Sequence, residues 1–470
     1  MTAPKPRRQF DRSIVEGSLR RAVWMIAWPT MLQNIIGGLQ GVVDHAMVGH
    51  YVGYTANAAI GVSVQIFIVV IVFITSLYTG MGVLVARFAG QNDHDRVNRA
   101  VYQAFLTSVG LSLGILAPIG WFTSPWLLTL VNAEPAVRAE ALPYLRTMFV
   151  GSLGMLMFFM VGGALRAAGD AKTPLRLGVA MTFLNIVLNI ILIRGWGPIP
   201  ALGTLGAALG TVIAGTAVSL VAIILFLRGD LVVGFDAGMS RKPDLRVIRE
   251  LFRFGLPTGI QGIAMNIGGV LMLRFIGSLQ RSAEAQAAYA VGYTELFSLI
   301  TWSSVGLMGA AAAVAGQNLG AGRPERSSQA VAIAARIGLL VAGVVGIAFL
   351  TIPRILLGAF GMTEPEVVRI GTQLLAYLAV SGLFVTVALT YTGGLQGTGD
   401  TKSPLYISIV SQIVIPLGIC AVLDLMGRLT PAGIWTAIVL GHATRCALSV
   451  WRFRQGRWRE IQVQMEPARG

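Results

Sequence analysis

The stretch GALRAAGDAKTPL, from Gly163 to Leu175, occurs a second time in this chain as GGLQGTGDTKSPL, from Gly393 to Leu405. The two copies begin about half a chain length apart. Two further pairs of segments keep nearly the same offset: Gly90-Gln91-Asn92 with Gly316-Gln317-Asn318, and Glu134-Pro135 with Glu364-Pro365. The chain is therefore a tandem duplication of one structural unit.

The composition places the duplicated unit in a membrane. Hydrophobic residues make up 55% of the chain and charged residues 12%, and the mean hydropathy is +0.71. Apolar runs near the roughly 20 residues that a helix needs to cross a bilayer recur too often for a water-soluble core. We predict an all-α membrane protein with about twelve spans. They are expected at residues 22–47, 58–88, 99–122, 138–166, 173–195, 203–227, 248–275, 285–315, 327–352, 366–394, 403–427 and 431–453.

The duplication predicts two lobes of six helices each. An even number of spans puts both repeats in the membrane in the same orientation, related by a pseudo-two-fold axis along the membrane normal. Repeats of this kind place the substrate path of a transporter at their interface. We expect a cytoplasmic N-terminal tail, an N-terminal lobe, a cytoplasmic linker, a C-terminal lobe and a cytoplasmic C-terminal tail, at residues 1–21, 22–227, 228–247, 248–453 and 454–470.

The net charge of +15 comes from 36 Lys and Arg against 21 Asp and Glu. If the N-terminus is cytoplasmic, most basic residues fall in cytoplasmic loops and tails, while Arg445 lies within the last span. This positive-inside pattern indicates topology and contact with anionic lipid headgroups rather than nucleic-acid binding. The basic N-terminal stretch lacks a small-residue cleavage site, so we expect it to be retained. We predict a multi-pass protein of the inner (plasma) membrane with both termini in the cytoplasm.

The duplicated loop has the features of a tight turn between two helices. Gly169 suits a helix end that needs a positive φ, Thr173 can cap the next helix, and Pro174 suits its first turn. The second copy repeats this arrangement. Asp170 and Asp400 are expected at the cytoplasmic surface, where each can pair with a base or cap a helix. A structural turn is favoured over a substrate contact.

Ionisable side chains within membrane spans are candidate functional groups, because a charge at the bilayer centre costs at least about 2.5–3.5 kcal/mol. Asp44, late in the first span, and Glu295, in the eighth, are the clear acidic candidates. Tyr293 and Trp302 are among the aromatic residues that flank Glu295, and an acid among rings suits an organic cation. The alternative interpretations are an interfacial helix-end acid for Asp44 and a hydrogen-bonded packing acid for Glu295.

Two amides are candidates for a cation-coupling role. Asn185 and Asn189 are four residues apart in the fifth span, so they share one helix face. Two amides on one face can coordinate a cation. Hydrogen bonding between helices is the alternative that the sequence leaves open.

Two glutamines occupy equivalent places in the two halves. Gln33 and Gln261 are candidate substrate-binding residues, and each follows a proline, Pro29 or Pro257. Because proline removes a backbone hydrogen bond, these prolines can bend the first helix of each lobe. We expect such a bend to reshape the cavity as the transporter alternates.

These motifs together resemble the multidrug and toxic compound extrusion (MATE) family. The resemblance covers about residues 20–455 and rests on Pro29, Val43-Asp44, Met47-Val48-Gly49, Gly90-Gln91 and the paired Gly-Asp-Lys-Pro loops. It implies two six-helix lobes around a V-shaped cavity and export of amphipathic, often cationic compounds driven by inward proton or sodium flow. It also implies that Asp44 binds the coupling cation, that Asn185 assists it, and that Glu295 contacts the substrate.

Two departures from the family pattern bear on the coupling ion. Asn189 stands where relatives that hold the cation within the N-terminal lobe often have a second aspartate. The C-terminal lobe has Met265-Asn266 and Val385 near the places where some members have a glutamate and an aspartate. The missing acids favour proton coupling through Asp44, although amides that assist one carboxylate can also hold sodium.

We therefore expect a secondary active antiporter that exports amphipathic, cationic drugs or metabolites against inward proton or sodium flow, by alternating access. Its expected partners are a small organic cation, the coupling cation and membrane lipids, without nucleic acid, and it is expected to be a monomer. A flippase for a lipid-linked saccharide or another amphipathic lipid is the alternative, and it would work without an ion gradient. A membrane enzyme is less favoured, because no catalytic motif, metal-ligand spacing or cofactor motif occurs.

Overall fold

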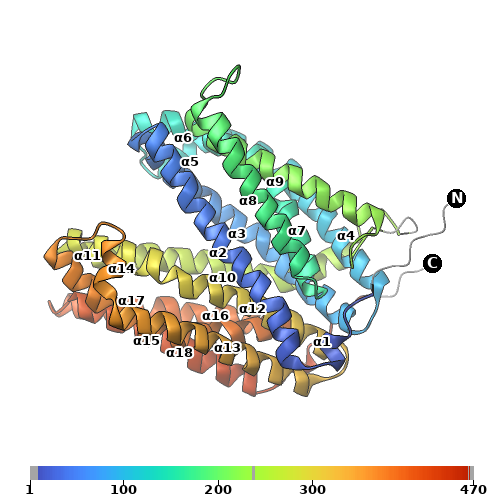
Figure 1. Cartoon of the computed structure of the whole chain (residues 1–470). Coiled ribbons are helices and arrows are strands. Elements are labelled where there is room, and N and C mark those ends of the chain that lie inside the picture. Colours follow the sequence, from blue (N-terminus) through green and yellow to red (C-terminus); the bar gives the residue numbers. More distant parts are fainter. Residues whose placement is uncertain (1–8, 236–238, 464, 466–470) are drawn as a thin grey trace. The chain divides into compact units, whose positions relative to one another are not determined.

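The computed structural model describes residues 9–235, 239–463 and 465, and in these residues it is helical except for turns and one isolated β-bridge, Trp196 to Ile199 (Figure 1). The described residues form two compact units. Unit 1 comprises residues 9–12 and 35–259 with the described residues from 463 onward, and unit 2 comprises residues 13–34 and 260–462. Each unit is described separately below.

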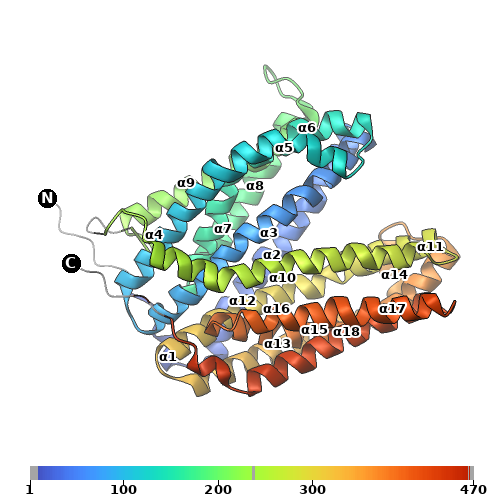
Figure 2. The same ribbon diagram turned by 180° about the vertical axis from the view of Figure 1, so that it is seen from behind.

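Unit 1 is a bundle of helices whose apolar faces meet in one core. Helix α3 packs against α4, α6 and α7, and α9 packs against α6, α7 and α8 (Figure 2). Phe67, Leu145 and Phe149 are among the core residues. The helices are α3 (Tyr54–Gly90), α4 (His94–Leu111), η1 (Ser112–Leu116), α5 (Ala117–Leu130), α6 (Pro135–Val150), α7 (Ser152–Ala167), α8 (Lys172–Arg194) and α9 (Gly203–Arg228).

Unit 2 is a second bundle, in which α15 packs along α12, α13 and α18. Its core includes Phe297, Phe349 and Trp435. Two of its long helices contain short π-helical stretches, η2 and η3. The helices are α1 (Ser13–Glu16), α11 (Ser282–Tyr289), η2 (Ala290–Leu296), α12 (Ser298–Gly320), α13 (Pro324–Thr351), α14 (Pro353–Gly358), α15 (Pro365–Thr398), α16 (Lys402–Ile409), η3 (Val410–Val414), α17 (Ile415–Leu425), α18 (Pro431–Arg454) and η4 (Arg457–Glu460).

Two long helices contribute to both units, α2 (Leu19–Tyr51) and α10 (Leu245–Gly277). The first part of α2 packs in unit 2, where a methyl group at Gly306 would lie 2.7 Å from Met31 Cα. The first part of α10 packs in unit 1, where a methyl group at Gly80 would lie 2.1 Å from the carbonyl oxygen of Leu251. The boundary between the two units therefore lies within α10, after Gly259, and not in the predicted linker at residues 228–247. The predicted boundaries follow the sequence repeat and stay a prediction.

Part of the predicted N-terminal tail is a packed element of unit 2. Ile14 and Val15 of α1 are buried. Their carbonyl oxygens accept hydrogen bonds from Asn318 Nδ2 at 3.2 Å and Arg323 Nη1 at 2.8 Å, and Arg326 Nη2 donates to the carbonyl of Gly17 at 2.7 Å. Residues of the second Gly-Gln-Asn segment and the turn after it therefore hold α1 in place.

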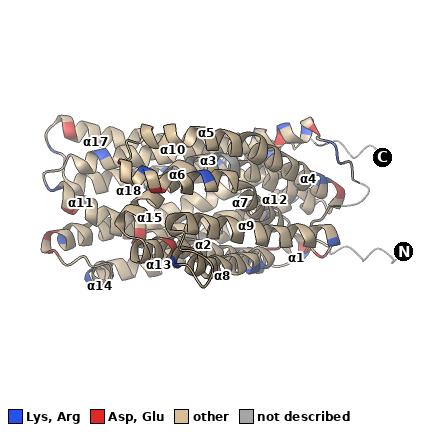
Figure 3. Ribbon diagram, turned by 90° about the horizontal axis from the view of Figure 1, so that it is seen from above, with Lys and Arg blue, Asp and Glu red and all other residues tan. Residues whose placement is uncertain are grey.

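The helices agree with the predicted spans. Among the described residues, nine helices are long and apolar enough to cross a membrane, or ten if the bent pair α6 and α7 is counted as one span. Most of the helical ribbon carries neither acidic nor basic residues (Figure 3). The predicted spans 22–47 and 431–453 lie in α2 and α18, which are long helices but less apolar because each carries several polar side chains.

The two prolines predicted to bend the first helix of each lobe lie inside uninterrupted helices. Pro29 lies within α2 and Pro257 within α10. Helical structure continues on both sides of each ring, so neither proline ends its helix. A bend at these positions during transport stays a prediction.

The duplicated loops share one backbone conformation. Gly169 and Gly399 both have φ of 101°, as predicted for a glycine at a helix end. Of the two predicted capping groups, the hydroxyl residue and the aspartate, the structure shows that the aspartate after each glycine caps the next helix. Asp170 Oδ1 accepts a hydrogen bond from the Thr173 backbone N–H at 3.0 Å and Asp170 Oδ2 accepts one from the Thr173 hydroxyl at 2.6 Å. Thr173 is thus a donor to the cap rather than the cap itself.

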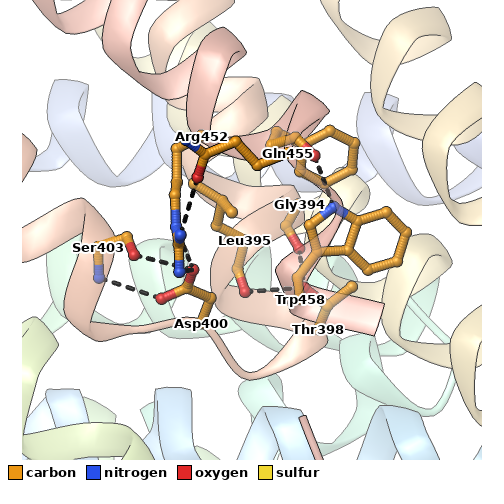
Figure 4. Close-up of polar contacts among 9 residues, drawn as sticks. Gly394, Leu395, Thr398, Asp400, Ser403, Arg452, Gln455 and Trp458 are labelled. Atoms are coloured by element: carbon orange, nitrogen blue, oxygen red, sulfur yellow. Dashed lines mark hydrogen bonds and ion pairs between the residues drawn. The ribbon is translucent and has the colours of Figure 1, made fainter. Parts of the chain in front are cut away.

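The second loop adds an ion pair that the first lacks. Asp400 accepts from the Ser403 backbone N–H at 3.1 Å and from its hydroxyl at 2.8 Å. Its Oδ2 also accepts from Arg452 of α18, with both Nε and Nη2 at 3.0 Å (Figure 4). In the described part of the chain, Asp170 makes no ion pair. The predicted alternatives of pairing or capping are therefore both realised at Asp400, with Arg452 as the base.

Candidate functional site

Asp44 belongs to a polar cluster inside unit 1. It lies on the part of α2 assigned to this unit and is half-buried, while Asn185 and Asn189 on α8 are fully buried. Asn189 Nδ2 donates a hydrogen bond to Asp44 Oδ1 at 2.7 Å. The structure thus brings the three predicted cation-coupling residues together.

Asn185 completes the shell around the carboxylate. With its nitrogen turned to Asp44, the Asn185 amide donates to Asp44 Oδ1 over 3.1 Å, and its oxygen accepts from Thr211 Oγ1 of α9 at 3.2 Å. This orientation satisfies both ends of the amide. Two amide nitrogens then converge on one carboxylate oxygen, which concentrates donors where negative charge is held.

Asn189 also presents an acceptor without a partner. Its Oδ1 is buried and makes no hydrogen bond among the described residues. It lies against α9, where a methyl group at Gly210 would be only 2.1 Å away. A buried oxygen without a donor costs about 1–3 kcal/mol, so this atom is suited to bind a cation or accept a hydrogen bond when one is available.

Three polar residues around this cluster were not singled out from the sequence. The Thr211 hydroxyl donates to the Asn185 oxygen, and Gln40 Oε1 accepts a hydrogen bond from Thr182 Oγ1 of α8 at 2.8 Å. Gln40 lies four residues before Asp44, so helical spacing was a usable signal for it. Thr182 and Thr211 give no such signal, because threonine within an apolar helix commonly bonds to its own backbone.

Glu295 lies in η2 of unit 2 and is half-buried. Its carboxylate makes no hydrogen bond or ion pair with the described residues. Tyr293 stacks on Tyr289 with ring centroids 4.8 Å apart and lies 5.4 Å from the Phe297 ring, so it packs against the core of unit 2. Residues two apart on a helix do not face each other. The acid and Tyr293 therefore do not form one cluster.

The other predicted substrate contacts have different surroundings. Gln261 is buried, donates to Ser408 Oγ at 2.7 Å and accepts from Gln396 Nε2 at 3.3 Å, so both ends of its amide are engaged within unit 2. Gln33 and Trp302 are half-buried. The roles predicted for these residues stay predictions.

Comparison with known proteins gives consistent matches along the chain. A family model described as MatE matches residues 29–191 and 257–422. The chain is 26% identical over 449 residues to "Probable multidrug resistance protein NorM" of Thermotoga maritima, covering 95% of this chain and 94% of that protein. It is also 26% identical over 448 residues to "Probable multidrug resistance protein YoeA" of Bacillus subtilis, covering 95% and 96% respectively.

A solved structure supports the fold independently. It is described as the outward-facing conformation of a multidrug resistance MATE family transporter of the MOP superfamily. It matches this chain with a TM-score of 0.88 at 20% identity, covering 96% of this chain and 98% of that one. The predicted all-α membrane fold is confirmed by this similarity. The first matched segment of the family model contains Asp44, Asn185 and Asn189.

Proposed function

Because the chain belongs to the MATE family of transporters, we propose that it is a secondary active antiporter that exports amphipathic, cationic drugs or metabolites. Inward proton flow drives the export, and the carrier works by alternating access in the inner membrane with both termini in the cytoplasm. The observation that carries the proposal is the contact of the Asp44 carboxylate with two buried amides of α8. This is the one described cluster of unit 1 in which an acid inside a span meets buried amides.

The amides allow the carboxylate to exist in two states. As an anion, Asp44 accepts hydrogen bonds from the nitrogens of Asn185 and Asn189. When a proton binds, the carboxyl group becomes a donor, and the unpartnered Oδ1 of Asn189 is available to accept that new O–H. A change of hydrogen bonds between α2 and α8 then accompanies each protonation event.

The same geometry explains how a metal cation would compete. A sodium ion at Asp44 would find the carboxylate and the Asn189 oxygen as ligands, and hard cations prefer such oxygen atoms. A proton needs only one oxygen to bind, whereas a metal cation is held by several oxygen ligands, and the described cluster offers one carboxylate and one free amide oxygen. We therefore propose proton coupling, with sodium as the competing ion to be tested.

Glu295 is the proposed contact for the positive charge of the substrate. Its half-buried carboxylate makes no bond within the described protein, so it is available to an organic cation. An acid without a partner inside a span is unfavourable until a cation binds. This state favours substrate capture by Glu295 over a purely structural role.

The test is efflux of ethidium from cells that express the wild type, Asp44→Asn or Glu295→Gln, with proton and sodium gradients imposed separately. Asp424→Asn is the matched control, because Asp424 is exposed near the end of α17. We expect proton-driven efflux that Asp44→Asn abolishes, that Glu295→Gln weakens and that the control retains. Correctly inserted protein without efflux under either gradient would overturn the proposal and favour an amphipathic lipid as substrate.

A further inference from the structure

Helix α18 carries a line of buried polar side chains through the interior of unit 2. Trp435, His442, Arg445 and Ser449 are at most 7% exposed. Their spacing of seven, three and four residues places them on one face of the helix. Helix α15 packs along α18 and adds the fully buried Ser381.

Each of these side chains has a buried polar atom without a hydrogen-bond partner. Among the described residues, no partner contacts Trp435 Nε1, His442 Nδ1, Arg445 Nε, Ser449 Oγ or Ser381 Oγ. Native structures contain few such atoms, because each costs about 1–3 kcal/mol when left unpaired. Three of them, on His442, Arg445 and Ser449, lie within two turns of one helix face, where one bound group can reach them.

Arg445 is the charged member of the set. An arginine stays protonated in proteins, and an unpaired buried charge costs several kcal/mol. The one buried acid among the described residues is Asp400, which is bound to Arg452. Arg452 lies seven residues further along α18, or about 10 Å away at the rise of an α-helix. Arg445 therefore has no protein counter-charge in the described chain.

We propose that Arg445 is the centre of an anion site inside unit 2, which takes a small, singly charged anion, either a halide or a carboxylate group. The unpaired groups nearest in sequence can donate: the Ser449 hydroxyl lies one turn after Arg445, and His442, which donates from Nδ1 in the tautomer protonated there, lies one turn before it. The Phe297 ring stacks on the His442 ring with centroids 6.0 Å apart and lies 5.4 Å from the Tyr293 ring, so aromatic side chains of η2 and its neighbour pack beside His442.

The size and charge of the ligand follow from these neighbours. One guanidinium balances one negative charge, so a dianion such as phosphate would leave excess charge in a buried place. Trp435 lies ten residues from Arg445, or about 15 Å along the helix, and is outside the site. This site prefers the charge opposite to that of the Asp44 cluster in unit 1.

The test uses the purified full-length chain in detergent, kept in sodium sulfate at constant ionic strength, because the site is not expected to take a dianion. Chloride, bromide or acetate replaces sulfate in steps while Tm is measured for the wild type, Arg445→Gln and Arg454→Gln. Arg454 is the matched control, because it is an exposed arginine at the end of the same helix. No transport is measured, so a failure of the proposed efflux function does not affect the result.

We expect a saturable rise in Tm in the wild type and in Arg454→Gln, with at least tenfold weaker anion affinity in Arg445→Gln. A response to chloride and bromide alone identifies a halide site, and a response to acetate identifies a carboxylate site. No response to any of the three anions, or the same response in Arg445→Gln, would overturn the proposal.

A second measurement covers the case in which Arg445→Gln does not fold. Crystals of the wild type grown in bromide should show an anomalous peak within hydrogen-bonding distance of the Arg445 guanidinium, while crystals grown in acetate should show matching density for a carboxylate. A site without either ligand, filled by ordered water alone, would show that the proposal is wrong.

Discussion

Replacing Asp400 by asparagine should destabilise the protein much more than the same change at Asp170. In the second loop, Asp400 Oδ2 accepts from Arg452 Nε and Nη2 and from the Ser403 hydroxyl. An amide nitrogen in place of that oxygen would face three donors. In the first loop, Asp170 Oδ2 accepts from the Thr173 hydroxyl, which can rotate and accept instead.

The magnitude follows from the ion pair. Breaking a buried pair by removing one partner costs about 3–5 kcal/mol. Arg452 keeps 22% of its side chain exposed and can reach water, so we expect the lower end, about 3 kcal/mol. Loss of a helix cap typically costs about 1 kcal/mol and asparagine caps about as well as aspartate, so Asp170→Asn should cost less than about 1 kcal/mol. For a unit of this size, 2 kcal/mol of difference corresponds to roughly 4–8 °C in Tm.

The assay is thermal unfolding of both purified variants, with Arg452→Gln and the double variant Asp400→Asn/Arg452→Gln to form a cycle. We expect the double variant to unfold close to Arg452→Gln, because the pair is already broken there. Equal Tm values for Asp400→Asn and Asp170→Asn would refute this reasoning, since the two loops differ mainly by the arginine.

Three further predictions concern other parts of the chain. Gly210→Ala should lower coupled efflux about tenfold or more, because its methyl group would displace the Asn189 amide from Asp44 and break a charge-assisted hydrogen bond worth about 1.5–3 kcal/mol. Gly215→Ala on the same helix is the control and should not lower efflux, since its methyl group would meet its nearest neighbour at 3.6 Å. Burial raises the pKa of Asp244, but hydrogen bonds from Arg99 and two backbone N–H groups outweigh it and hold the pKa below its ordinary value. Its stabilisation is therefore complete above the ordinary pKa and is lost as pH falls through the lowered one, so Asp244→Asn should flatten the acid side of a Tm profile; an unchanged profile would contradict this. Arg326→Gln should make α1 more sensitive to limited proteolysis, and equal cleavage rates would count against the role of its bond to the Gly17 carbonyl.

The helices were predictable because apolar runs of membrane length dominate the chain. The conformation of the duplicated loops was also predictable, since a positive φ at Gly169 and Gly399 follows from residue type. The capping group was not, because an aspartate and a hydroxyl residue lie three positions apart and either can cap the helix. Only the fold determines which one accepts the backbone N–H.

The candidate site was predicted in part. Helical spacing placed Asn185 and Asn189 on one face, and the family resemblance linked them to Asp44. In the structure, Asn189 donates a hydrogen bond to Asp44. The lack of an ion pair at Arg445 was not predictable, because whether a charge inside a span is paired depends on the packing of α15 against α18. Periodicity within one helix carries no information about the facing helix.

The sharing of α2 and α10 between the units has a consequence for the origin of the chain. A single copy of the repeat would contain one such helix. The first part of that helix packs in the other unit, so in a single copy it would have no helices to pack against. Two identical copies would complete each other by exchanging these segments, as in a domain-swapped homodimer. Joining the two copies in one chain makes the exchange intramolecular. Either half expressed alone and extracted in detergent should therefore aggregate or dimerise, and co-expression of the two halves should restore a folded protein.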